Sequence, residues 1–139
     1  VRPPYDVRPV AVFRSDMSLA FDPYNHFAAI PSQLLKGIAQ DLLAASGRFE
    51  AVVASTSAAS SSHLVELTVT DLRLDCSAGT EDNPSQNATV ALSLIVLDRD
   101  RRIVASGKGT GGSSVEDGDF GTAFSKAFAA AVDKVTETL

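Results

Sequence analysis

Cysteine and histidine are nearly missing from this chain, and tryptophan is absent. Its 139 residues include one cysteine, Cys76, and two histidines, His26 and His63. A lone cysteine cannot form an internal disulfide, and a zinc site needs several cysteine or histidine ligands. Cys76 closes a strand-like run, which favours a small buried hydrophobe, because a nucleophilic thiol needs an electropositive setting and a nearby histidine. We therefore expect no metal ion and no cofactor; the redox compartment stays open.

Concentrated positive charge is also missing. The 12 basic residues are outnumbered by 17 acidic ones, which gives a net charge of −5 and a pI near 4.8. The one basic cluster, at 99–102, is interrupted by Asp100 and preceded by Asp98. A protein that neutralises several phosphates needs a concentrated basic face. Nucleic acid is therefore excluded as a partner.

Long apolar runs are missing as well. The longest, such as residues 94–97, are far shorter than the roughly 20 residues that span a bilayer. The sequence starts at Val1 rather than at methionine, so we expect an upstream segment to have been removed. Any membrane attachment is then expected to lie upstream of the residues given.

The composition itself is that of an ordinary soluble domain. Hydrophobic residues make up 45% and charged residues 21%, within the usual range for a globular protein. A chain of this length buries roughly two-thirds of its unfolded surface around one core. We expect a single domain over residues 1–139.

Short strands and one helix are predicted in the first half. Residues 8–14 and 17–21 read as extended pieces, and Asp22-Pro23 is expected to end the second, since the residue before proline is pushed out of the helical region. Pro31 suits the first turn of a helix and Gly47 its end. An apolar stripe marks the face expected to meet the core: Leu34, Leu35, Ile38, Leu42 and Ala45.

Residues 49–54 read as a short strand after the helix. A strand, a helix and a strand at this spacing suggest a parallel pair joined by a right-handed crossover. Residues 55–62 form a polar loop. The longest strand signal follows at 63–76, where apolar side chains change parity, so a bulge is predicted near Thr70-Asp71.

A hairpin and a second helix are predicted in the last third. Residues 88–97 and 103–110 read as its two strands, with the chain loosening at 111–114. The final helix is expected from about Asp119, whose charge favours a helix N-terminus. Two helices and five or six mostly antiparallel strands predict an α+β fold, a two-layer sandwich of a mixed sheet packed with helices.

Two motifs suggest chemistry that the residues do not support. The glycine run at 107–112 has Arg102 where a P-loop needs its first glycine, and Gly109 follows Lys108 instead of serine or threonine. The carboxylates at 98–100 and 116–119 lack the glycine and glutamate spacing of an EF-hand loop. We expect no catalytic residues.

A polar-aromatic segment before the first helix is the candidate site. Tyr24, Asn25, His26 and Phe27 lie between two prolines, in a stretch read as irregular. One interpretation is a surface that contacts a partner or ligand, with Tyr24 and His26 exposed. The other is that Phe27 and Ile30 staple the helix entry to the core.

The same segment carries a family resemblance. The shared entry consists of Tyr24, Phe27-Ala28 and Pro31, and the shared exit of residues 46–49 and 52–53. A strand at 64–74, a hairpin at 97–106 and an alanine-rich closing helix follow. This layout resembles the ABC-type transport auxiliary lipoprotein family, the periplasmic lipoproteins that accompany MCE-type (mammalian cell entry) lipid transport systems. Phe27 stands where that family has tryptophan.

The resemblance implies a non-enzymatic accessory protein in the periplasm of a Gram-negative bacterium. It implies a lipid anchor on an upstream cysteine, in the outer membrane, and an MCE substrate-binding protein, an ABC permease and its ATPase as partners. The cargo of the system would be phospholipid or another hydrophobic molecule. Oligomeric state stays open, and a homo-oligomer is allowed.

Two other classes remain. One is an envelope assembly factor, such as an activator of a wall synthase or a chaperone of an outer-membrane pore. The other is a hydrolase, which the scarcity of catalytic residue types supports least.

Overall fold

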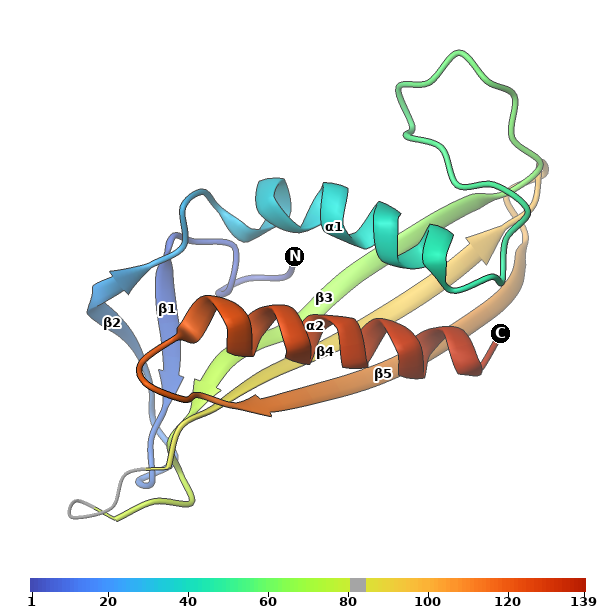
Figure 1. The fold of residues 1–139 in the computed structure, drawn as a ribbon. Helices are drawn as coiled ribbons and strands as arrows, with labels where there is room; N and C mark the ends of the chain where they lie inside the picture. The colour runs from blue at the N-terminus through green and yellow to red at the C-terminus, as the bar shows by residue number, and fades with distance from the viewer. Residues whose placement is uncertain (81–84) are drawn as a thin grey trace.

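The computed structural model describes residues 1–80 and 85–139, and it shows a five-stranded sheet with two helices on one face (Figure 1). The elements, in chain order, are β1 (Pro9–Phe13), β2 (Leu19–His26), α1 (Pro31–Ala45), β3 (Leu64–Asp75), β4 (Asn87–Leu97), β5 (Ile103–Ser114) and α2 (Phe120–Glu137). The predicted α+β class is confirmed.

The strands are ordered β2-β1-β3-β4-β5. β1 and β3 are parallel, and the other three neighbouring pairs are antiparallel. The mixed, mostly antiparallel sheet predicted from the sequence is confirmed, including the hairpin of β4 and β5.

The core lies between the sheet and the helices. Along β4, Val90, Leu92 and Leu94 are fully buried while Thr89 and Ser93 on the other face are half-buried. This alternation is typical of an antiparallel sheet with one face covered. α2 completes the core with residues that include Phe128, Ala131 and Val132, each at most 1% exposed.

The predicted bulge in β3 is confirmed. The register with β4 shifts between Val69 and Asp71, and the Thr70 hydroxyl donates to the carbonyl of Ala91 at 3.1 Å. The extra residue turns Val69 and Leu72 to the same face, so both are buried.

β5 continues to Ser114, so the expected loosening at 111–114 is wrong. The alternate glycines Gly107, Gly109 and Gly111 lie against the backbone of α2. A Cβ on Gly109, for example, would come within 2.7 Å of the Val135 nitrogen. The glycines remain in the strand because their missing side chains let the helix approach the sheet.

No strand forms at residues 49–54, contrary to prediction. The parallel partner of β1 is the end of β3, at Arg73–Asp75. Phe49 and Val52 instead pack their side chains against the core, and the backbone of 51–54 has no regular structure. The apolar residues of this run serve packing, not strand pairing.

α1 lies farther from the sheet than α2 does. No Cα atom of α1 comes within 8 Å of a strand Cα atom in the described ranges, whereas α2 makes close approaches to β4 and β5. Pro31 and Leu43 are its buried residues. Ile38 is 44% exposed and Ala45 is exposed, so the predicted stripe is wrong at these two positions.

Candidate functional site

The segment predicted as a site forms a turn inside β2. Pro9 pairs with His26 and Ala11 pairs with Phe21, so residues 22–25 bulge out of the ladder opposite one residue of β1. β2 nevertheless continues to His26, so the expected end of the strand at Asp22-Pro23 is wrong, while its pairing with β1 is interrupted there. β2 lies at the edge of the sheet, where a proline is tolerated because its missing N–H need not pair.

Asp22 organises this turn. Its Oδ1 accepts from the backbone nitrogens of Tyr24 at 2.8 Å and Asn25 at 3.2 Å, and its Oδ2 accepts from Nδ2 of Asn25 at 2.7 Å. These hydrogen bonds lower the pKa of Asp22 below its ordinary value, and the bond from the Asn25 side chain contributes most to the lowering. Sequence reasoning missed Asp22; the signal available was the tendency of aspartate to bond the backbone two residues on.

The four predicted site residues divide between solvent and core. Tyr24 is 90% exposed, and His26 is exposed with its Nε2 3.2 Å from the carbonyl of Pro23. Asn25 is half-buried and held by Asp22. Phe27 turns inward, where its ring meets Phe124 edge to face at a centroid distance of 5.3 Å. The structure thus displays Tyr24 and His26, and it uses Phe27 at the helix entry.

Further exposed apolar side chains lie on β2 and in the turn that precedes it. Leu19 is 39% and Phe21 43% exposed on the strand, and Met17 in the turn is 74% exposed. With Tyr24 they make up what we call the β2 surface. β2 pairs with β1 on one side and ends the sheet on the other. Single exposed apolar residues are common, but several on a strand with one free edge are typical of an interaction site.

A small cavity lies behind the turn. It has a volume of about 460 Å³, and three predicted site residues line it: Asn25, His26 and Phe27. The rest of its wall is mainly apolar and comes from α1 and the start of α2, including Phe120 and Phe124. The turn thus borders both solvent and an apolar interior.

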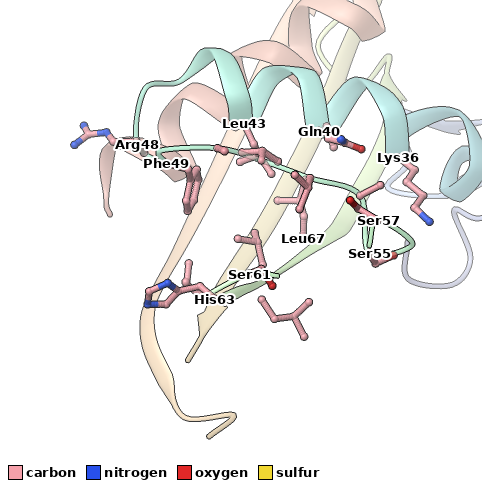
Figure 2. A pocket seen from close by; sticks show the side chains of 18 of the residues that line it. Lys36, Gln40, Leu43, Arg48, Phe49, Ser55, Ser57, Ser61, His63 and Leu67 are labelled. Carbon is pink, nitrogen blue, oxygen red and sulfur yellow. The ribbon is translucent and has the colours of Figure 1, made fainter. Parts of the chain in front are cut away.

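A larger cavity of about 1220 Å³ opens on the other side of α1. α1, the connection from α1 to β3, and the sheet enclose it. Figure 2 shows Leu43, Phe49 and Leu67 around this space, with Lys36 at one end and Arg48 at the other. We call it the α1 groove. Sequence reasoning missed it, because no sequence pattern reports how far a helix stands from a sheet.

Cys76 is the one cysteine of the chain, and it is half-buried. Burial, followed by the charge of Asp75, raises the pKa of the Cys76 thiol, whereas a nucleophilic cysteine needs the opposite shift. Within residues 1–80 and 85–139, no three His, Cys, Asp or Glu residues gather as metal ligands would. No helix of the same residues has the length and apolar character needed to cross a membrane.

A solved structure shares this fold. Protein XCC0632 from Xanthomonas campestris, described as DUF330, superposes with a TM-score of 0.68 at 22% identity, over 95% of this chain and 72% of that one. No family model and no curated protein matches the chain. At this identity the likeness shows the fold.

Proposed function

We propose that this chain is a non-enzymatic accessory protein of the cell envelope that works by binding other proteins. The observation that carries the proposal is the β2 surface, where Phe21 and Tyr24 on the edge strand β2 and Met17 just before it are exposed. Aromatic residues and methionine are enriched in protein interfaces. Because Asp22 accepts from the backbone nitrogen of Tyr24, the backbone of the turn has less conformational freedom left to lose on binding.

We propose further that the partner is the MCE-family substrate-binding protein of an ABC-type lipid transport system. The resemblance to the transport auxiliary lipoproteins at the entry and exit of α1 supports this. In this role the chain is held in the periplasm by an acylated upstream cysteine in the outer membrane. The permease and ATPase act from the inner membrane on lipid cargo.

The test is capture of partners from the native host with the full-length, tagged protein. We expect the MCE protein among the captured proteins, and we expect Tyr24→Ala with His26→Ala to reduce its recovery without changing the melting temperature. Ile103→Ser is the matched control, because Ile103 is 62% exposed in the turn region of the β4–β5 hairpin, away from β2. Capture of a wall synthase or an outer-membrane pore instead would contradict the transport role and establish an assembly factor.

A further inference from the structure

Half-buried apolar side chains line the α1 groove on two sides, Val65 and Leu67 from β3 and Leu35 and Ala39 from α1. Leu43, Val69 and Phe128 also border it and belong to the buried core. A helix packed on a sheet normally closes such a space, because voids lose contacts on both walls. Here the spacing of α1 from the strands keeps it open.

Four charged or titratable side chains line the groove in a chain whose net charge is −5: Lys36, Arg48, Glu50 and His63. Figure 2 shows Lys36 at one end beside Ser55 and Ser57, whereas the guanidinium of Arg48 points away from the space. At this end of the groove, the ammonium group of Lys36 and the hydroxyls of Ser55 and Ser57 therefore lie beside apolar side chains of the lining.

The cover of the groove is the connection between Ala45 and Leu64. It is longer than the about 12–15 residues beyond which loops without secondary structure become uncommon and are usually functional. Within this connection, the backbone nitrogen of Ser57 donates to the carbonyl oxygen of Ala54, and the backbone nitrogen of Ala59 donates to the hydroxyl of Ser57. Among the described residues, no hydrogen bond joins residues 49–62 to α1, α2 or the sheet. Apolar contacts of Phe49 and Val52 hold the cover, so it can open without breaking a ladder.

We infer that the α1 groove binds an amphipathic lipid, with its acyl part on the apolar side chains of the lining and an anionic headgroup at Lys36. Apolar side chains of the lining, such as Leu35, Val65 and Leu67, can contact hydrocarbon, and the polar side chains beside them can contact a headgroup. The volume exceeds the about 300–1,000 Å³ of common ligand pockets, which suits a long chain. Lys36 and the serine hydroxyls match a phosphate or a carboxylate.

Only one part of this inference rests on the proposed function: that the bound lipid is the cargo of the transport system. If both hold, the protein contacts the transported molecule itself. Lipid binding can be measured with purified protein and lipid, without any partner. Failure of partner capture would therefore leave the groove intact as a binding site, and failure of lipid binding would leave the β2 surface intact.

The experiment is native mass spectrometry of the protein after incubation with vesicles of phosphatidylglycerol and phosphatidylethanolamine, together with titration of a fluorescent long-chain fatty acid. We expect one bound lipid, enriched in phosphatidylglycerol. Recovery of phospholipid identifies a diacyl ligand, and binding of the fatty acid alone identifies a single-chain one. Absence of both, or release of a co-purified peptide in place of lipid, would overturn the inference.

Two matched pairs of variants locate the ligand. Ala39→Phe fills the groove from α1 and should weaken binding by about tenfold or more, whereas Ala44→Phe, on the exposed side of the same helix, should not. Lys36→Glu should weaken phosphatidylglycerol binding by about threefold and remove the preference for it. Lys108→Glu makes the same charge change on an exposed part of β5 and should have no effect. Equal effects within either pair would contradict the assignment of the site.

Discussion

Gly111 of β5 lies directly against the peptide group that follows Ala127 in α2. A Cβ atom on Gly111 would overlap the carbonyl oxygen of Ala127 and come within 2.6 Å of the Ala131 nitrogen. The same relationship recurs at Gly109 and Gly107, one turn of α2 farther along each time. The glycine run, which resembles a phosphate loop at first sight, is the surface on which α2 rests.

Gly111→Ala is therefore expected to destabilise the protein by about 2 kcal/mol or more. The added methyl group meets helix backbone, which cannot rotate away as a side chain can, and overpacking of this kind costs typically about 1–3 kcal/mol. Urea unfolding followed by circular dichroism measures the loss.

Gly112→Ala is the control in the same strand. The atom nearest to its added Cβ is the Ala88 carbonyl oxygen at 3.7 Å, an ordinary contact. Its effect should lie within about 0.5 kcal/mol, the usual range for surface substitutions. Equal effects at both positions would show that glycine flexibility in β5, and not contact with α2, controls stability.

These glycines also show why some of the fold was predictable and some was not. Alternating apolar residues predicted β3, β4 and the faces that they bury, and the parity change at Thr70-Asp71 predicted the bulge. Both predictions succeeded because alternation with a period of two can be read from neighbouring residues alone. Whether Gly111 ends a strand or lies under a helix depends on α2, which is distant in sequence. The apolar run at 49–54 failed for the same reason, since β3 already occupies the place beside β1.

The candidate site was predictable in its position and not in its form. The aromatic and polar residues at 24–27 predicted a site in this segment, and Tyr24 is exposed. Its shape depends on Asp22 bonding forward to Asn25 and on the edge position of β2, which tolerates Pro23. The α1 groove depends on the distance of a helix from the sheet, a quantity that packing of the whole chain decides.

Phe27 and Tyr24 should differ sharply in their effects on stability. Phe27→Ala removes a half-buried ring and its edge-to-face contact with Phe124, so we expect a loss of about 2 kcal/mol, below the about 3–5 kcal/mol of a fully buried phenylalanine. Tyr24→Ala removes a ring that is 90% exposed and should leave the melting temperature nearly unchanged. Differential scanning calorimetry compares them. A large loss at Tyr24 would mean that the turn depends on its ring.

Asp119 should make α2 sensitive to acid. Its carboxylate accepts from the Thr122 hydroxyl at 2.6 Å and from the Thr122 nitrogen at 3.0 Å, and these bonds lower its pKa below the ordinary 3.8. A lowered pKa in the folded state means that this stabilisation is present above pH 3.8 and is lost as the pH falls through the folded value.

Asp119→Asn tests this dependence, because asparagine also caps helices but does not titrate. The variant should melt at a lower temperature than the parent at neutral pH, where the carboxylate also favours the helix N-terminus. The difference should shrink when the melts are repeated near pH 3. Asp41→Asn, an exposed position within α1, serves as control. A constant difference at both pH values would mean that the charge of Asp119 contributes nothing.

The route to the membrane gives the last prediction. Residues 1–139 carry a net charge of −5, which opposes attraction to anionic lipid. The apolar face of α2 is buried in the core, where Ala127, Phe128 and Val132 are at most 1% exposed. Little apolar surface of this helix is therefore available to insert into a membrane interface. Expressed alone, these residues should stay in the supernatant when centrifuged with anionic or neutral vesicles, even while carrying a single lipid taken from them.

The full-length precursor should fractionate with membranes through an acylated cysteine upstream of Val1, and replacing that cysteine with serine should release it. Co-sedimentation of residues 1–139 with bare vesicles, or a precursor without such a cysteine, would contradict the lipoprotein assignment and leave the β2 surface to be explained by a different partner.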